Sequence, residues 1–175
     1  MYRILCLLPC VILLGACATA SKTSQTKKTA VHTTGHKMVV RTTAYTANEP
    51  GGGCNACGER LHFGAGGSYS AAADWSWLPL GTRFRMAETG RTYVIEDYGS
   101  ALVGRKTIDL FMPSGSAMRA WGVRNVNIEV LEWGSKAMSL KLLAPRQRAG
   151  YVRRMVDQLK KDGVDRSSGP LLARE

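Results

Sequence analysis

The chain has 175 residues, and its 24 Lys and Arg residues against 13 Asp and Glu residues give a net charge of +11. The basic excess lies in two flanks, because residues 18–43 hold five basic and no acidic side chains and residues 136–175 hold ten basic and four acidic ones. Residues 44–135, with eight basic and nine acidic side chains, are nearly neutral. This distribution argues against nucleic acid as a partner and favours contact of the flanks with an anionic membrane or wall polymer.

Residues 1–17 are typical of a bacterial export signal. Arg3 precedes the apolar run 4–14, which is about half as long as the roughly 20 residues that a membrane-spanning helix needs. The run leads into Leu-Gly-Ala-Cys17, which resembles a lipobox, so we expect Cys17 to be lipidated and to anchor the protein in the cell envelope. In a cell with two membranes, Ala18 after it predicts the outer membrane, facing the periplasm. Cleavage after the Ala-Thr-Ala sequence at 18–20 is the alternative and would release a soluble protein.

Residues 18–37 form a polar stretch with almost no large apolar side chains, which predicts a flexible tether. A strand is expected next, over 38–46, followed by a loop over 48–67 that contains seven glycines and the pair Cys54 and Cys57. In an exported protein this Cys-x-x-Cys predicts a local disulfide. A more specific alternative is a zinc site with His62 as the third ligand, but a clear fourth ligand is lacking. A redox-active cysteine pair is the third possibility. No metal and no cofactor are therefore expected.

The remaining elements are short. Strands are expected over 83–86, 92–97, 107–111 and 125–133, and Ser114 can cap a small helix that ends at Gly122. Many short strands with one small helix suggest a closed barrel. A basic tail over 136–175 contains an amphipathic helix, expected from Pro145 to Asp162 with Gly163 as its C-cap. Its apolar stripe either docks on the barrel or lies on a membrane.

Asp109 is the most conspicuous polar residue, because it lies inside the apolar sequence Ile-Asp-Leu-Phe-Met. Side chains alternate along a strand, so if Ile108 and Leu110 face the core, Asp109 faces a groove. Asp97 ends the preceding strand, and a hairpin-like pairing is expected to bring it near Asp109 and raise the pKa of that carboxyl. On composition alone, Asp97 is equally a turn residue and Asp74 a capping residue.

Four motifs occur in order along residues 40–133: Ala-Tyr-Thr-Ala at 44–47, Ala-Asp followed by Leu-Pro-Leu-Gly-Thr at 73–82, Glu-Asp-Tyr-Gly at 96–99, and Ile-Asp-Leu-Phe at 108–111. Together they resemble the 3D domain, a family named for three aspartates. The resemblance implies a six-stranded double-psi β-barrel over 38–135. It also implies kinship with membrane-bound lytic transglycosylase A and other proteins that act on peptidoglycan glycan strands.

The resemblance also implies roles for individual residues. Asp109 matches the general acid/base, Asp97 its partner, and Asp74 the first aspartate of the catalytic trio, with a structural or groove-shaping part. The expected reaction cleaves the bond between N-acetylmuramic acid and N-acetylglucosamine and leaves 1,6-anhydro ends. A binding module without catalysis is the alternative function. A scaffold for other proteins that uses the basic tail is a third. Aromatic faces can bury the apolar side of sugar rings or fill a core, so the candidate substrate contacts are Tyr45, Thr46, Trp75, Trp77 and Trp121. Since the chain has no room for the second domain of the transglycosylase, either the 48–70 loop with its Cys-x-x-Cys and the basic tail supply the other wall of the site, or the barrel is shorter and less active.

Overall fold

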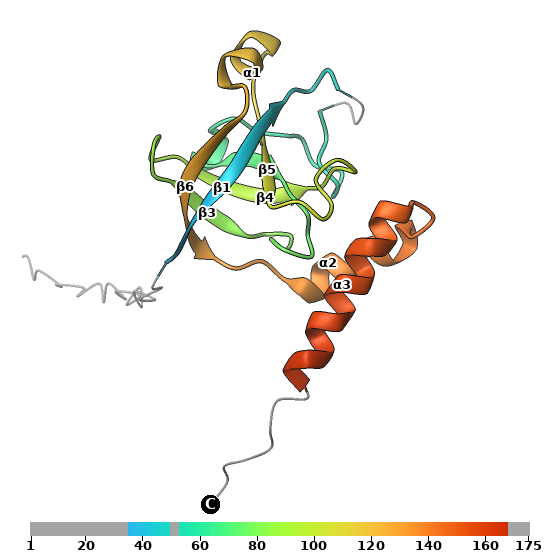
Figure 1. Ribbon diagram of the computed structural model, residues 1–175. Coiled ribbons are helices and arrows are strands. Elements are labelled where there is room, and N and C mark those ends of the chain that lie inside the picture. Colours follow the sequence, from blue (N-terminus) through green and yellow to red (C-terminus); the bar gives the residue numbers. More distant parts are fainter. Residues whose placement is uncertain (1–34, 50–52, 168–175) are drawn as a thin grey trace, which may run out of the picture. The chain divides into compact units, whose positions relative to one another are not determined.

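A computed structural model of the chain describes residues 35–49 and 53–167, with side chains up to residue 163. The strands form a β-barrel (Figure 1). It closes in the strand order β1-β5-β2-β4-β3-β6. The strands are β1 (His36–Tyr45), β2 (Tyr69–Ala72), β3 (Arg83–Met86), β4 (Thr92–Asp97), β5 (Thr107–Phe111) and β6 (Arg124–Glu132). The closed six-stranded barrel predicted from the sequence is confirmed.

Most strands lie where alternation of apolar side chains places them. Strands β3, β4 and β5 have the predicted bounds, whereas β1 begins at His36, two residues before the expected start, and β6 begins one residue early at Arg124. The β3–β4 hairpin turns at Gly90, whose φ of 66° suits a residue without a side chain. Helix α1 (Gly115–Trp121) is capped by Ser114, whose Oγ accepts from the N–H of Ala117.

Strand β2 was not predicted, although it lies at the centre of the site. Its sequence, Tyr-Ser-Ala-Ala, lacks the β-branched side chains that mark a strand. It pairs in parallel with β4 and antiparallel with β5. Ala72 therefore lies opposite Asp97 on one side and opposite Asp109 on the other.

The barrel interior is filled by the alternate side chains of the strands, as predicted for β5, where Ile108 and Leu110 are fully buried. Aromatic side chains complete this core: Trp75, Phe84 and Tyr93 have no exposed surface. The half-buried Asp109 lies on the opposite face of β5 from Ile108 and Leu110. The same alternation that builds the core thus leaves this carboxyl outside it.

The tail folds as α2 (Lys136–Leu143), a 3-10 turn η2 (Ala144–Arg146) and α3 (Gly150–Ser167). The predicted helix bounds are wrong at both ends, because Pro145 lies in the 3-10 turn and Gly163 lies inside α3. The predicted apolar stripe is confirmed: one set of side chains of α3 is buried and belongs to the same core cluster as the barrel, namely Val152, Met155, Val156 and Leu159. No helix within residues 35–49 and 53–167 has the length and apolar character required to cross a membrane.

The expected lipidation site at Cys17, the signal segment 1–17 and nearly all of the tether lie outside the described residues. Of the tether, only residues 35–37 are described, and His36 and Lys37 already belong to β1.

Candidate functional site

A cavity of about 600 Å³ lies at the ends of strands β1, β4 and β5. Its strand residues are Arg41, Thr43, Tyr45, Ala72, Asp97, Thr107 and Asp109; its other lining residues are Thr46, Glu49, Gly53, Cys54, Leu61, Tyr98, Gly99, Ser100, Ala101, Leu102, Arg105 and Tyr151. Two of the three predicted aspartates thus line the same cavity. So do two of the five predicted substrate contacts, Tyr45 and Thr46.

Asp109 lies on the floor of this cavity. Strands β1 and β5 run parallel with Thr43 opposite Asp109, and the Thr43 hydroxyl donates to Asp109 Oδ1 at 2.6 Å. Burial raises the pKa of Asp109, and the negative charge of Glu49 raises it further. The hydrogen bond from Thr43 and the positive charge of Arg41 oppose this rise. The result is a carboxyl that holds its proton to a higher pH than an exposed aspartate.

Asp97 lies at the end of β4. Burial raises its pKa to about 6, against the opposing effect of the N–H of Tyr98, which donates to Asp97 Oδ1 at 2.9 Å. The charge of Glu96 raises this pKa, whereas the backbone N–H of Ala56 and the charge of Arg146 lower it. Asp97 therefore changes its protonation close to neutral pH.

The predicted pairing of the strands that carry Asp97 and Asp109 is wrong, because β2 lies between them. Both aspartates flank Ala72, so their α-carbons are two strand spacings, roughly 10 Å, apart. The small side chain of Ala72 leaves space between the two carboxyls. Accordingly, the acid that raises the pKa of Asp109 is Glu49 and not, as expected, Asp97.

Tyr45 lies on the same face of β1 as Thr43. Its ring contacts Phe111 at 5.6 Å between centroids, and its hydroxyl oxygen is buried without a hydrogen-bond partner among the described residues. Burial raises the pKa of Tyr45, and the charges of Asp97 and Asp109 raise it further. A neutral hydroxyl with an unused donor therefore lies near both carboxyls.

Asp74, the first of the three predicted aspartates, does not line the cavity. It is buried, and its Oδ1 accepts from the backbone N–H and the hydroxyl of Ser76 at 2.8 and 2.6 Å. Its Oδ2 accepts from the N–H of Gly104 at 2.7 Å. Asp74 thereby fixes the β4–β5 loop, whose residues 99–102 form a rim of the cavity. This agrees with the structural or groove-shaping part that the sequence assigned to it.

The three tryptophans proposed as sugar platforms are not in the cavity lining. Trp75 is fully buried, donates from Nε1 to the carbonyl of Asp97 at 2.9 Å and packs edge-on against Tyr98. Trp77 packs against the core, and Trp121 donates to the hydroxyl of Thr42 while Arg124 covers its ring at 4.3 Å. Trp75 thus fills the core, the alternative that the sequence left open, whereas Trp77 and Trp121 are partly buried against it.

Two comparisons with known proteins bear on this geometry. The family model of the 3D domain matches residues 69–132, which include β2 to β6 and all three aspartates. These residues are a 3D domain. Over 96 residues the chain is 36% identical to the cell wall-binding protein YocH of Bacillus subtilis (strain 168). The match covers 54% of this chain and 32% of that protein, so the chain spans about a third of the length of this relative.

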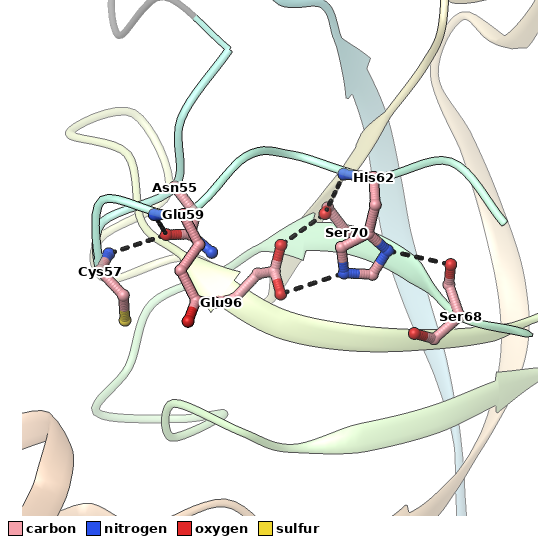
Figure 2. Close-up of polar contacts among 7 residues, drawn as sticks. All are labelled: Asn55, Cys57, Glu59, His62, Ser68, Ser70 and Glu96. Atoms are coloured by element: carbon pink, nitrogen blue, oxygen red, sulfur yellow. Dashed lines mark hydrogen bonds and ion pairs between the residues drawn. The ribbon is translucent and has the colours of Figure 1, made fainter. Parts of the chain in front are cut away.

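The loop before the 3D domain supplies a second wall to the site, with Gly53, Cys54 and Leu61 in the cavity lining. Figure 2 shows how polar contacts hold it. Asn55 Oδ1 accepts from the N–H groups of Cys57 and Glu59 at 2.9 Å, which closes the turn between the cysteines. His62 bonds the carbonyl of Ser68 through Nδ1 and Glu96 through Nε2, at 3.0 and 3.3 Å.

The expected disulfide is not formed, because Cys54 and Cys57 are both free thiols with exposed side chains. The turn they flank is closed instead by Asn55, and Cys54 pairs with Arg60 in an isolated bridge. The zinc alternative loses His62, since both ring nitrogens of this residue have other partners (Figure 2). In the part of the chain that the structure describes, no group of three or more His, Cys, Asp or Glu side chains could hold a metal ion.

The tail after the 3D domain also reaches the site. Tyr151 of α3 lines the cavity and lies 6.3 Å from Tyr98 between ring centroids. Arg146 donates to the hydroxyl of Tyr98 at 3.3 Å and to the carbonyl of Ala56 at 2.9 Å, which links the tail to both the β4–β5 loop and the cysteine loop. The loop and the tail thus both contribute residues to the cavity lining.

Sequence reasoning missed several cavity residues, among them Arg41, Thr43, Glu49 and Arg105. The alternation along β1 could have found two of them, because residues 41, 43 and 45 share one face of a strand and Tyr45 was already a candidate. Glu49 and Arg105 lie in loops, where no periodicity gives their direction.

Proposed function

We propose that the protein is a lytic transglycosylase that cleaves the bond between N-acetylmuramic acid and N-acetylglucosamine in peptidoglycan, with Asp109 as its single general acid/base. The observation that carries the proposal is the half-buried carboxyl of Asp109 on the cavity floor, held by Thr43 and with a raised pKa. The 3D domain and the cell wall-binding relative support a peptidoglycan-associated function.

The reaction requires one group that first gives and then takes a proton. Protonated Asp109 donates its proton to the glycosidic oxygen as the bond from that oxygen to C1 of the muramyl residue breaks. The C6 hydroxyl oxygen of the same residue then attacks C1 and closes the 1,6-anhydro ring, and its proton returns to Asp109. No water is consumed and no covalent enzyme intermediate forms, so the second carboxyl of an ordinary glycosidase is not needed. A raised pKa suits the acid step near neutral pH.

Asp97 and Tyr45 act beside Asp109 in this proposal. At about 10 Å between α-carbons, Asp97 is too far to share a proton directly with Asp109 but faces the same bound strand. The Tyr45 hydroxyl has no hydrogen-bond partner among the described residues, so a hydroxyl or carbonyl oxygen of the glycan can take its hydrogen bond without displacing one of these residues. Tyr45 is therefore a hydrogen-bond donor to substrate rather than a stacking platform.

The place of the protein in the cell is part of the proposal. We infer that Cys17 carries the lipid anchor and that the residues between it and β1 connect it to the barrel, which lets the domain reach the wall from the membrane. In a cell with two membranes, the anchor lies in the outer one. Membrane fractionation and mass analysis of the mature N-terminus test this; an N-terminus at Ser21 without lipid would contradict it.

A binding module without catalysis is the second candidate. It is favoured by the name of the relative, a cell wall-binding protein. The same cavity would then hold a glycan strand, and the raised pKa of Asp109 would reflect burial alone.

Analysis of products from purified peptidoglycan separates the candidates. Anhydro-ended muropeptides are expected from the transglycosylase. New reducing ends would contradict that reaction and indicate hydrolysis, and retention of the protein on sacculi without any product would indicate the binding module. Loss of both binding and product would contradict the proposed peptidoglycan-associated function.

A further inference from the structure

Two arginines line the cavity and take no part in the proton transfer proposed above: Arg41 on β1 and Arg105 in the β4–β5 loop. We propose that they form a subsite for a carboxylate of the glycan substrate, so that the cavity selects acidic muramyl strands over neutral glycans. This inference rests on the proposed function, because it names the substrate group that the same site recognises.

The position of Arg41 follows from the register of the parallel strands. Arg41 lies opposite Thr107, and two residues further along each strand Thr43 lies opposite Asp109. Arg41 and Thr43 share one face of β1, with α-carbons about 6.6 Å apart. Arg41 Nη1 donates to the hydroxyl of Thr107 at 3.4 Å. The exposed side chain of Arg41 therefore lines the cavity near the proposed acid, close enough for its charge to lower the pKa of Asp109.

The second guanidinium is placed by the loop that Asp74 fixes. Asp74 accepts from the N–H of Gly104, and the N–H of Arg105 donates to the carbonyl of Leu102 at 2.9 Å. The backbone on both sides of Arg105 is therefore held, although its side chain is exposed. The held backbone fixes the position from which the Arg105 side chain extends. The exposed guanidinium keeps its N–H groups available to donate hydrogen bonds to a ligand.

Neither guanidinium is neutralised by a close carboxylate. The ion pairs within 4.0 Å in residues 35–49 and 53–163 join His62 to Glu96, Arg85 to Glu129 and Lys136 to Asp162. The acids of the cavity instead lie around the proposed catalytic group: Asp109 itself, Asp97, and Glu49, whose charge acts on Asp109. An anionic ligand group is thus attracted to the Arg41 side and repelled from the side of these acids.

The chemistry of the glycans supplies the matching group. A chain of N-acetylglucosamine presents hydroxyl and neutral amide groups only. N-acetylmuramic acid adds a lactyl ether with a carboxyl group, which is either free or extended into a stem peptide that carries carboxylates of its own. Guanidinium binds carboxylate through paired, charge-assisted hydrogen bonds. Binding this group at the two arginines would place the muramyl residue beside Asp109, as the reaction requires.

The test measures binding of three soluble ligands of equal sugar length: chito-oligosaccharide, glycan without peptides, and glycan with its stem peptides. Every protein carries Asp109→Asn so that no ligand is cleaved. Arg41→Gln/Arg105→Gln is compared with Lys160→Gln/Lys161→Gln, which removes the same charge from exposed positions of α3 outside the cavity. The cavity variant should bind acidic glycan about tenfold more weakly, as expected when charged hydrogen bonds are lost, and chito-oligosaccharide unchanged.

Comparison of the three ligands identifies which group of the substrate supplies the carboxylate. A loss with peptide-free glycan supports the lactyl carboxylate, and a loss confined to peptide-bearing glycan supports the stem peptide. An equal loss with the neutral ligand, an equal loss in the Lys160/Lys161 variant, or no loss at all would overturn the subsite while leaving glycan binding intact. Absence of binding to every ligand in the Asp109→Asn protein, and of binding to sacculi in the wild type, would instead overturn the proposed function.

Discussion

At the scale of single residues, burial controls the acids of the cavity. Asp97 and Asp109 are both half-buried, and loss of solvent is the largest cause of the rise in the pKa of each. Hydrogen bonds from Thr43 and from the N–H of Tyr98 oppose the rise without cancelling it. Both carboxyls therefore hold their protons to a higher pH than exposed aspartates do, and burying their charged forms lowers the stability of the fold.

Asp97→Asn should show how much stability the protein loses by burying the charged carboxylate of Asp97. Because the folded pKa of about 6 lies above 3.8, the ordinary pKa of an aspartate, the native state binds the proton more tightly, and stability falls as pH rises from about 4 to about 6. Above that window the wild type holds a buried charge that the amide lacks. The variant should therefore melt higher at pH 7, by roughly 2–4 °C for each 1 kcal/mol recovered, and lose this advantage below pH 4.

The measurement is a set of thermal melts from pH 3.5 to 7.5, with Asp157→Asn, the same change at an exposed site on α3, as the control. A melting temperature that follows the wild type at every pH would show that Asp97 is not destabilised by burial.

Tyr45→Phe removes the unpartnered hydroxyl from the cavity. Stability should be unchanged or slightly higher, because no hydrogen bond within the described protein is lost. Turnover or affinity for glycan should fall about 3–10-fold, the effect of one lost hydrogen bond. Tyr93→Phe is the matched control, since its hydroxyl is also buried without a partner but lies outside the cavity lining. Equal glycan binding and turnover in wild type and Tyr45→Phe would refute the donor role.

At the scale of elements, the β4–β5 loop depends on Asp74. Asp74→Asn replaces one of its accepting oxygens with a donor, which leaves either the Ser76 pair or the N–H of Gly104 without its acceptor. A lost bond to a buried carboxylate costs about 2 kcal/mol, so the melting temperature should fall by roughly 4–8 °C. Activity of the folded fraction should be reduced less than in Asp109→Asn. A variant that melts with the wild type but is inactive would return Asp74 to the catalytic group.

The strands show what local sequence can predict. Alternation placed β3, β4 and β5 at their observed bounds and put Asp109 on the face away from the core. It could not find β2, whose alanines carry no strand signal, and without β2 the neighbours of Asp97 and Asp109 were assigned wrongly. Which strands pair in a closed barrel depends on contacts far apart in sequence, and those leave no periodic trace.

The tryptophans show the second limit. Aromatic residues serve sugar binding and cores equally well, and only burial decides between them. Trp75 is fully buried, whereas the ring of Tyr45 reaches the cavity. The resemblance to the 3D domain, by contrast, correctly indicated Asp97 and Asp109 as members of one cavity, because its motifs record contacts between distant strands.

At the scale of the molecule, barrel and tail share one core. Met155 of α3 is fully buried in the cluster that contains the barrel interior, and Ser139 of α2 accepts from the N–H of Leu80 at 3.0 Å. Met155→Ala should therefore destabilise the whole domain by about 2–5 kcal/mol, with one cooperative transition in denaturant. Met138→Ala, the same change at a side chain that is 47% exposed, should have little effect. A separate early transition of the tail, with the barrel unchanged, would contradict the shared core.

The central claim is that Asp109 carries the chemistry, and muropeptide release by purified wild type and Asp109→Asn on the same sacculi tests it most directly. The amide keeps the size of the side chain and can accept the hydrogen bond of Thr43, so the variant should remain folded in a parallel melt. Its release of anhydro-ended muropeptides should fall by at least about 10²–10⁴-fold, the usual contribution of general acid–base catalysis, while Asp157→Asn releases them at the wild-type rate. Full release by folded Asp109→Asn would contradict the account.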